Sequence, residues 1–257
     1  MNLKQYLLNR AREWVKAENR AQMLAQSHLK GFPESMPNEY LETMRAIHAD
    51  VKSHEIDTLI DVGAHKGLFA QAASHFYSFD KILCFEPNTD LHPVLQAATQ
   101  GLPVVISSSA VGKVASRSTY YAHADSSMSS LVASNEEVLR EFFPYDNPDG
   151  IEEREVGVQP LDAFLEKEGL SQKEILLKID TQANELDVLS GAEQVLAVTR
   201  ACVVEHMFVN AYEANYTFED LLAFMQKNGF QCRGCLSVSH RPNGAVSSVD
   251  FFFTKAA

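Results

Sequence analysis

Ionisable side chains occur where two apolar, strand-like segments end. In the stretch LLKIDTQANELDVLSGAE, an apolar run changes into a polar cluster at Lys178 and Asp180. A second run, ACVVEHMF, ends in Glu205 and His206. A carboxylate beside an imidazole is a plausible proton-accepting pair, because burial perturbs the pKa values of both groups. Neighbouring residues of a strand point to opposite faces, however, so the two need not touch, and His206 could equally be a core histidine.

A glycine-containing turn and a later carboxylate indicate a nucleoside site. In DVGAHKG, Gly63 and Gly67 allow the backbone to approach a ligand closely. The spacing is not the dinucleotide pattern G-x-G-x-x-G, because His65 stands at the middle glycine position. Glu86 follows at roughly the twenty to twenty-five residues expected of a ribose-binding carboxylate. It could otherwise be a solvated carboxylate before a helix, and the serines at 107–109 could bind an adenine edge or form a plain turn.

Alternating segments predict the elements that position these residues. From residue 56 onward, short apolar strands alternate with helical patterns, which is typical of a parallel sheet covered by helices on both faces. Ligands of such sheets bind beyond the carboxyl ends of the strands, which is where the polar groups above are expected to lie. The final segments FQCRGCLSV and AVSSVDFFFTK predict an antiparallel hairpin.

Two regions depart from this alternation. Residues 1–54 predict two amphipathic helices, which could cap the sheet, form a lid or pair with another subunit. Residues 110–160 form an insertion, in which SAVGKVASRSTYYA predicts a hairpin. Several aromatic residues could stack on sugar rings or pack in the interior: Phe142, Phe143, Tyr145, Tyr212 and Tyr216. We therefore expect an N-terminal helical extension at 1–54 and one large domain at 55–257.

Composition disfavours several classes of function. With 34 acidic and 22 basic residues, the net charge of −12 argues against sequence-independent nucleic-acid binding and against docking on anionic membranes. No apolar run has the length of a membrane span or of a signal-peptide core, so a cytoplasmic location is expected. The CRGC segment, with Cys232 and Cys235, lacks a second pair of metal ligands. We expect inert thiols and no bound metal.

The motifs together resemble the FkbM-type family of S-adenosylmethionine-dependent methyltransferases. The matching segments are DVGAHKG, FEP, SAVG, SSL, KIDTQANELDVLSG and VEH, in this order within residues 56–254. The resemblance implies an α/β, Rossmann-like class I methyltransferase fold, with a seven-stranded, mostly parallel sheet. It also implies S-adenosylmethionine as cofactor and a hydroxyl of a sugar, glycan or specialised metabolite as acceptor. One departure is Ala183, where glycine is common in the family.

The resemblance carries roles to individual residues. Asp61, Gly63 and Gly67 would shape the methionine end of the cofactor pocket. Glu86 would hold the ribose, Ser109 and Ala110 would lie near adenine, and Asp180 would lie near the transferred methyl group. The neighbouring residues Ala64, His65 and Pro87 complete the predicted cofactor-binding set.

An unactivated hydroxyl has a high pKa, so a base near the methyl group should assist its transfer. Asp180 and His206 are the leading candidates for this base, and Glu205 is the next. Lys178 could orient the acceptor or form a structural ion pair with Asp180 or Glu205. The acceptor is expected to be a small molecule or a glycan, and the N-terminal helices could make the protein a homo-oligomer.

Two other functions stay open at this point. One is a non-catalytic protein of the same fold that binds the cofactor or a partner. The other, less favoured, is a dinucleotide-dependent oxidoreductase. His65 in the glycine turn and the terminal hairpin both argue against the second alternative.

Overall fold

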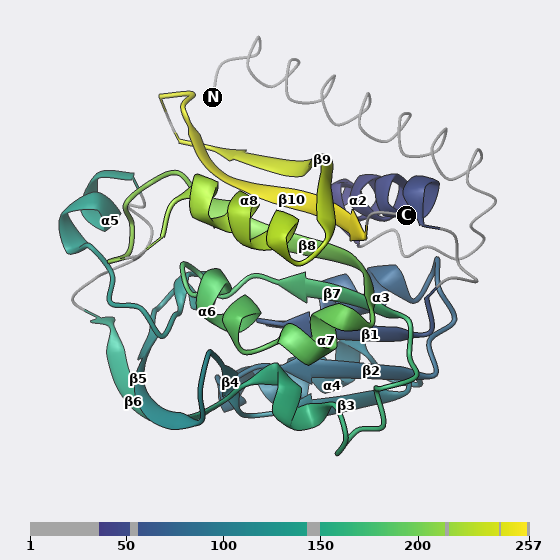
Figure 1. Cartoon of the computed structure of the whole chain (residues 1–257). Coiled ribbons are helices and arrows are strands. Elements are labelled where there is room, and N and C mark those ends of the chain that lie inside the picture. Colours follow the sequence, from purple (N-terminus) through teal and green to yellow (C-terminus); the bar gives the residue numbers. More distant parts are fainter. Residues whose placement is uncertain (1–35, 52–55, 143–149, 214–215, 242, 256–257) are drawn as a thin grey trace, which may run out of the picture.

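A seven-stranded sheet forms the centre of the molecule (Figure 1). The computed structural model describes residues 36–51, 56–142, 150–213, 216–241 and 243–255. The strand order is β3-β2-β1-β7-β8-β10-β9, and β10 is antiparallel to both of its neighbours. The strands are β1 (Thr58–Val62), β2 (Lys81–Phe85), β3 (Val104–Ser107), β7 (Ile175–Ile179), β8 (Thr199–Met207), β9 (Phe230–His240) and β10 (Val246–Lys255). The predicted mostly parallel sheet and its antiparallel C-terminal hairpin are confirmed.

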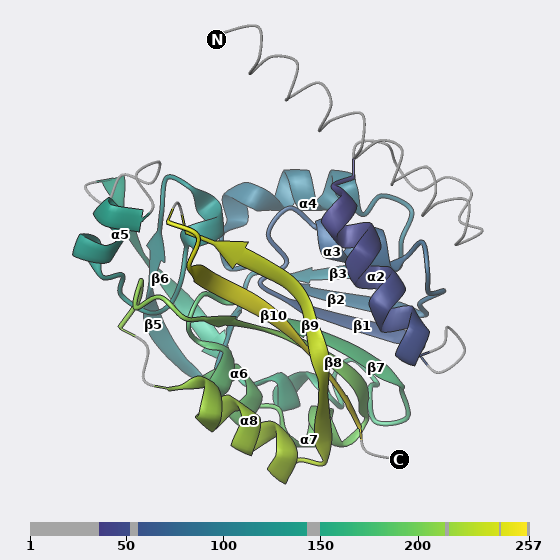
Figure 2. The same cartoon turned by 90° about the horizontal axis from the view of Figure 1, so that it is seen from above.

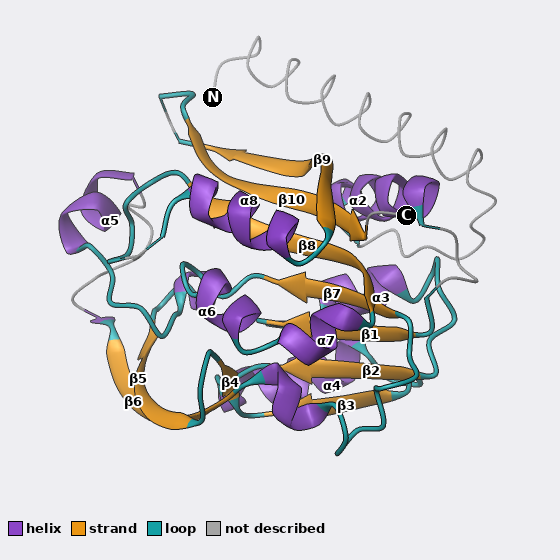
Figure 3. Cartoon of the chain, viewed as in Figure 1, coloured by secondary structure: helices purple, strands orange, loops and turns teal. Residues whose placement is uncertain are grey.

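Helices cover both faces of this sheet, as Figures 2 and 3 show. The face that we call the α2 face is covered by α2 (Asn38–Asp50), α3 (Leu68–Ala73) and α4 (His92–Ala98). The opposite face, the α8 face, is covered by α6 (Glu185–Ser190), α7 (Glu193–Ala197) and α8 (Phe218–Lys227). Within the described ranges, none of the helices combines the length and the apolar character that a bilayer crossing requires.

Helix α2 confirms the predicted helix just before the first strand. Its apolar side chains Leu41, Met44 and Ile47 recur every three residues, and all three are buried against the α2 face. Pro37 precedes the first helical residue, which suits a helix start. The other helix expected in the N-terminal extension lies outside the described residues.

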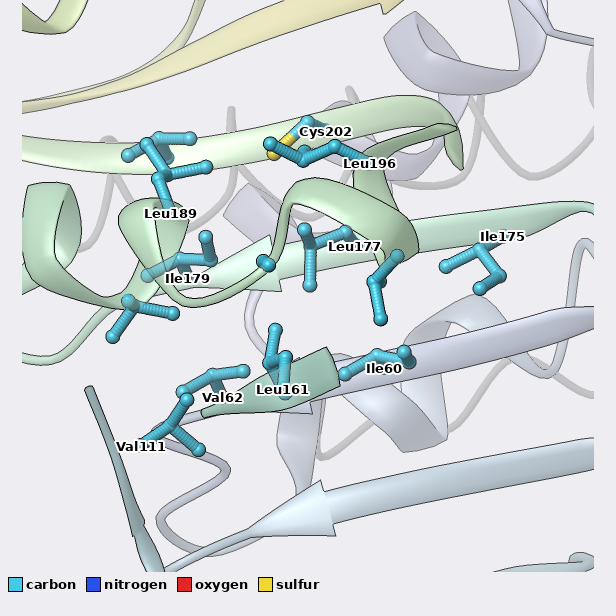
Figure 4. Packing of buried hydrophobic residues seen from close by; sticks show 14 of the residues in the cluster. Ile60, Val62, Val111, Leu161, Ile175, Leu177, Ile179, Leu189, Leu196 and Cys202 are labelled. Atoms are coloured by element: carbon cyan, nitrogen blue, oxygen red, sulfur yellow. The ribbon is translucent and has the colours of Figure 1, made fainter. Parts of the chain in front are cut away.

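The α8 face is sealed by apolar side chains (Figure 4). Ile60 of β1 and Leu177 of β7 point from the sheet toward Leu189 of α6 and Leu196 of α7, and all four are buried. Burial of each such side chain contributes roughly 1.5–3 kcal/mol of transfer free energy. This core fixes the strands whose carboxyl ends carry the polar residues.

The insertion forms a separate three-stranded sheet. Its strands are β4 (Ala110–Val111), β5 (Ser116–Ala122) and β6 (Glu152–Gln159), in the order β4-β6-β5. The hairpin expected for SAVGKVASRSTYYA is therefore wrong, because β6 lies between β4 and β5 and pairs with both, Val158 opposing Ala110 on one side and Ser116 on the other. The remaining elements are α5 (Glu136–Phe142) and the short 3-10 helices η2 (Thr89–Leu91), η3 (Ser126–Met128) and η5 (Leu161–Phe164).

Candidate active site

The turn between β1 and α3 depends on glycine. Gly63 has a φ of 73°, and His65 has a φ of 49°. A Cβ atom on Gly63 would lie 1.8 Å from the carbonyl oxygen of Asp180, so a larger residue cannot be accommodated without a shift of the backbone. The backbone N–H groups of Gly63 and Ala64 donate to the carbonyl oxygen of Phe85 at 3.0 and 3.1 Å. The turn thereby brings the ends of β1, β2 and β7 together.

Glu86 follows β2 and is only 4% exposed. Its Oε2 accepts the backbone N–H of His65 and its Oε1 accepts that of Asn88, each at 2.8 Å. Burial raises the pKa of Glu86, and these two hydrogen bonds oppose the rise. Each carboxylate oxygen can accept a further hydrogen bond, so the group is suited to bind two vicinal ribose hydroxyls.

A cavity opens at these strand ends, and we call it the first cavity. It is lined by Val62, Gly63, His65, Phe85, Glu86, Pro87, Ser109, Ala110, Val111, Tyr120, Ser126, Ser127, Ser129, Ser130, Leu131, Asp180, Thr181, Gln182 and Asn184. Seven of the predicted cofactor-binding residues are therefore brought together: Gly63, His65, Glu86, Pro87, Ser109, Ala110 and Asp180. The other three lie close by, since Ala64 lines an adjoining cavity, Asp61 is fully buried in β1, and Gly67 precedes α3.

A serine-rich segment of the insertion supplies a wall that the assigned roles missed. Residues 126–131 contribute five side chains to the first cavity. The ring Nε2 of His65 and the hydroxyl of Ser126 share a hydrogen bond of 2.8 Å. Ser130 donates to the carbonyl oxygen of Gln182 at 2.5 Å. The SSL motif at 129–131 was part of the resemblance, but its place beside Gln182 depends on contacts distant in sequence.

Lys178 holds two carboxylates at the centre of the site. Its Nζ lies 3.4 Å from Asp61 and 3.3 Å from Asp180, and it donates to the carbonyl oxygen of Gly63 at 2.8 Å. Burial alone would lower the pKa of Lys178, but Asp180 and Asp61 outweigh it and raise the pKa. Burial raises the pKa of Asp61, and Lys178 opposes the rise. The predicted structural ion pair with Asp180 is therefore present, with Asp61 as a further partner.

Asp180 and Glu205 form a coupled pair that Gln182 bridges. The amide Nε2 of Gln182 donates to Asp180 at 2.8 Å and to Glu205 at 2.6 Å. Burial acts to raise the pKa of Asp180, but Lys178 and a hydrogen bond from Glu205 outweigh it and lower the pKa. Burial, with Asp180 and Asp250 nearby, raises the pKa of Glu205 well above its usual range. The two pKa values therefore shift in opposite directions, which makes Asp180 the more acidic member of the pair.

The bridge depends on an unusual turn. Gln182 and Ala183 have φ values of 57° and 78°, in the left-handed region that non-glycine residues rarely adopt. Glu185 holds this conformation, because its Oε1 accepts the backbone N–H groups of Thr181 and Ala183 at 2.8 and 3.2 Å. The hydroxyl of Tyr216 donates to the other oxygen of Glu185. Such strain is typical of functional sites, and here it aims Gln182 at both carboxylates.

His206 lies apart from this cluster. Its ring packs against Phe208, Tyr216 and Phe218, with centroid distances of 4.9, 5.4 and 5.5 Å. It is 6% exposed and does not line the first cavity, and burial lowers its pKa. The structure therefore does not bring it together with Asp180.

Of the aromatic residues that could stack on sugar rings, two are engaged in hydrogen bonds inside the protein and the side chains of the others are not described. Tyr212 is buried, and its hydroxyl donates to the carbonyl oxygen of Met128 at 2.6 Å. Tyr216 is occupied by its hydrogen bond to Glu185. Phe143 and Tyr145, and the side chain of Phe142, lie outside the described residues.

None of the four cysteines lines the first cavity. Cys84 and Cys202 are buried in the sheet, whereas Cys232 and Cys235 are exposed on β9 without a disulfide between them. Burial raises the pKa of Cys232, so its thiol is protonated at neutral pH. Among the described residues, no group of three His, Cys, Asp or Glu side chains could hold a metal ion.

Solved structures that are similar to this chain include methyltransferases. The structure is similar to one provisionally assigned as an RNA methyltransferase from Pyrococcus horikoshii, at 14% identity over 93% of this chain and 96% of that one, with a TM-score of 0.47. It is also similar to magnesium protoporphyrin IX methyltransferase from Synechocystis, at 7% identity over 93% and 95% of the chains, with a TM-score of 0.42. With TM-scores below 0.5, these similarities carry no argument about the reaction. A search of curated proteins found no match.

A family model gives the decisive comparison. The Methyltransferase FkbM domain matches residues 61–232, which include the glycine turn, Glu86, Asp180 and Glu205. The residues present fit S-adenosylmethionine: the backbone at Gly63 leaves no room for a side chain, and Glu86 has acceptor capacity for the ribose. The chain belongs to the FkbM methyltransferase family, and its cofactor is S-adenosylmethionine.

Proposed function

We propose that the protein is an O-methyltransferase that acts on a hydroxyl of a sugar, glycan or specialised metabolite. Bound S-adenosylmethionine supplies an electrophilic methyl group. The observation that carries the proposal is Asp180, which lines the first cavity, whose pKa is lowered, and which Gln182 links to Glu205. The sugar or metabolite acceptor rests on the family resemblance.

Asp180 is the proton acceptor in this proposal. Lys178 keeps it ionised at neutral pH, and Gln182 and Glu205 fix its orientation by hydrogen bonds. A carboxylate held in this way can take the proton of a hydroxyl as the oxygen attacks. Asp180 is favoured over His206, whose ring is enclosed by aromatic side chains on the α8 face.

The proposed cofactor contacts follow the lining of the first cavity. Glu86 binds the ribose hydroxyls, and Ser109 and Ala110 lie against the adenine. Asp61 acts indirectly, since it is buried and contacts Lys178. Lys178 is a positioning residue, because its Nζ ties Asp180 to the glycine turn.

Calorimetric titration with S-adenosylmethionine is the first test of this assignment. We expect binding in the micromolar range and a loss of at least about tenfold in Glu86→Ala, because charge-assisted hydrogen bonds contribute roughly 1.5–3 kcal/mol. Glu193→Ala, an exposed glutamate of α7, is the matched control and should bind normally. Equal affinity of both variants would contradict the role of Glu86.

Methyl transfer to a panel of sugars and glycans then separates enzyme from binding protein. In Asp180→Asn we expect kcat to fall about 10²- to 10⁴-fold, the usual range for loss of a general base. His206→Phe should retain transfer, because His206 does not line the first cavity. Binding of S-adenosylmethionine without transfer to any hydroxyl acceptor would support the non-catalytic alternative instead.

The N-terminal extension has a proposed role as a lid or as a contact between copies of the chain. Helix α2 carries Glu39 and Tyr40 on the wall of a cavity beside Asp180, which supports the lid. Size-exclusion chromatography of a form lacking residues 1–35 tests the other role. An unchanged oligomeric state would exclude these residues as the assembly contact.

A further inference from the structure

A second cavity opens on the α2 face, beside the first. It is lined by Glu39, Tyr40, Thr43, Gly63, Ala64, His65, Lys66, Leu68, Phe69, Ser127, Lys178, Asp180, Val203, Ser237, Ser239 and Asp250. These residues come from α2, from the glycine turn with the start of α3, from the end of β7, from β8, β9 and β10, and, for Ser127, from η3 of the insertion. The cavity therefore extends from the centre of the site toward the terminal hairpin.

The two cavities share part of their walls. Gly63, His65, Ser127 and Asp180 line both. Methyl transfer is an in-line displacement, so donor and acceptor must approach to about 3–3.5 Å at a single point. A cavity that meets the cofactor cavity at Asp180, the proposed proton acceptor, satisfies this requirement. The cavity beside His206 shares no residue with the first cavity, so it does not.

The far wall of the second cavity carries small hydroxyls and carboxylates. Asp250 of β10 and Ser237 of β9 are directly opposed in the hairpin register, and Ser239 lies two residues beyond. Glu39 and Thr43 face them from α2. Hydroxyls can donate and accept, and carboxylates accept strongly, so this wall matches a ligand that carries several hydroxyl groups.

Charge restricts the ligand further. Of the described residues that line this cavity, Glu39, Asp180 and Asp250 are acidic, and Lys66 and Lys178 are basic. Lys178 is already engaged by Asp61 and Asp180, and Lys66 belongs to the glycine turn at the cofactor side. The part of the lining that comes from α2, β9 and β10 therefore holds two acids, Glu39 and Asp250, and no basic side chain, which disfavours a phosphate or carboxylate on the ligand.

We propose that the second cavity is the acceptor site and that it accepts a small polyhydroxylated molecule that is uncharged or cationic, and rejects anionic ones. This inference rests on the proposed methyl transfer to a hydroxyl. The state of Asp250 is consistent with it: burial first, then Asp180 and Glu39, raise the pKa of Asp250 to about 7, and Lys178 opposes them. Glu205 lies opposite Asp250 on β8, and burial together with Asp180 and Asp250 raises its pKa as well. Another anion here would meet the same repulsion.

Three sugars with one ring and different charges test the inference. Saturation-transfer NMR on protein loaded with S-adenosylhomocysteine would compare glucosamine, glucose and glucose 6-phosphate. We expect saturation transfer to glucosamine and glucose, and at least about tenfold weaker binding of glucose 6-phosphate. Ser237→Phe fills the cavity and should abolish the signals, whereas Val238→Phe, the exposed neighbour on the same strand, should keep them.

Calorimetry with S-adenosylmethionine on the same variants separates the two proposals. Unchanged cofactor affinity in Ser237→Phe, together with lost sugar signals, supports the acceptor site. Cofactor affinity lowered in Ser237→Phe but not in Val238→Phe would overturn it, because the cavity would then hold the methionine end of the cofactor. Preferred binding of glucose 6-phosphate, or no signal from any of the three sugars, would also overturn it. Failure of the intact protein to bind S-adenosylmethionine would instead count against the proposed function.

Discussion

The two faces of the central sheet differ in what they bury near the active site. On the α2 face, Lys178, Glu205 and Asp250 lie on three strands, and strand pairing places Glu205 directly opposite Asp250. On the α8 face, the next residues in sequence, Ile179 and His206, pack among apolar and aromatic side chains. The alternation of a strand is enough to produce this contrast.

The pKa shifts of Glu205 and His206 show how the two faces of the sheet treat ionisable groups. Both are adjacent in β8 and experience burial, yet burial raises the pKa of the acid and lowers that of the base. On the α2 face, Lys178 and Asp180 add charge interactions that leave a defined ionised group. On the α8 face, burial favours the neutral form of His206, and no comparable charge interaction opposes it. One face is therefore suited to proton transfer, and the other to packing.

The largest effect that would sharpen this contrast is expected for Lys178→Met. Removal of the ammonium leaves Asp61 and Asp180 buried without their shared cation, and breaking a buried pair in this way costs about 3–5 kcal/mol. Urea unfolding at pH 8 measures the loss. Lys66→Met, the same change at an exposed position of the same turn, is the control and should stay within about 0.5 kcal/mol of the wild type.

A double variant keeps this prediction testable if Lys178→Met does not fold. Asp61→Asn combined with Lys178→Met removes one of the two unpaired charges, so it should recover part of the lost stability. Equal losses of stability for Lys178→Met and Lys66→Met would show that the buried ion pairs of Lys178 on the α2 face contribute no more to stability than an exposed lysine does.

Asp250→Asn is expected to have an intermediate effect that depends on pH. The pKa of Asp250 is raised to about 7 in the folded protein, so ionisation costs stability as the pH rises from the unfolded value near 4 through 7. The variant should therefore increase the free energy of unfolding at pH 8 by up to about 4 kcal/mol, and have no such benefit below pH 4. Denaturant unfolding across this range measures it.

The control for Asp250 is Asp187→Asn, an exposed carboxylate of α6 on the opposite face. It should not reproduce the gain at pH 8. A gain of equal size in both variants would point to the overall charge of −12 rather than to the α2 face.

Sequence reasoning succeeded where the signal was local. The glycine turn, the carboxylate after the second strand and the alternating strands predicted the sheet and placed Gly63 and Glu86 at one end of it. Period-two alternation also separated Glu205 from His206, but it could not say which of them faces Asp180. That choice depends on how β8 pairs with β7 and β10, and the pairing is fixed by contacts distant in sequence.

Asp250 was missed, and the contacts of Ser126 with His65 and of Ser130 with Gln182 were not foreseen, for the same reason. Asp250 is a single acid in an apolar final strand, and only the hairpin register and the place of β10 beside β8 bring it to Glu205. Ser126 and Ser130 belong to an insertion whose β-pairing was itself predicted wrongly. A motif indicates chemistry where its residues are close in the chain, whereas a cavity wall collects residues from many elements.

The smallest effect is expected on the α8 face, for His206→Phe. Among the described residues, the buried Nδ1 of His206 has no hydrogen-bond partner, and the ring lies in an aromatic cluster that can accept phenylalanine. The pKa of His206 is lowered in the folded protein, so this residue reduces stability as the pH falls below its unfolded value near 6.5. The variant should have nearly the stability of the wild type at pH 8 and be more stable by up to about 1 kcal/mol at pH 5.5.

Thermal unfolding at the two pH values measures the difference, with His240→Phe on the exposed edge of β9 as control. An acid-induced loss that is as large in His206→Phe as in the wild type would mean that the α8 face does not hold this imidazole neutral, and the contrast between the two faces would then rest on the acids alone.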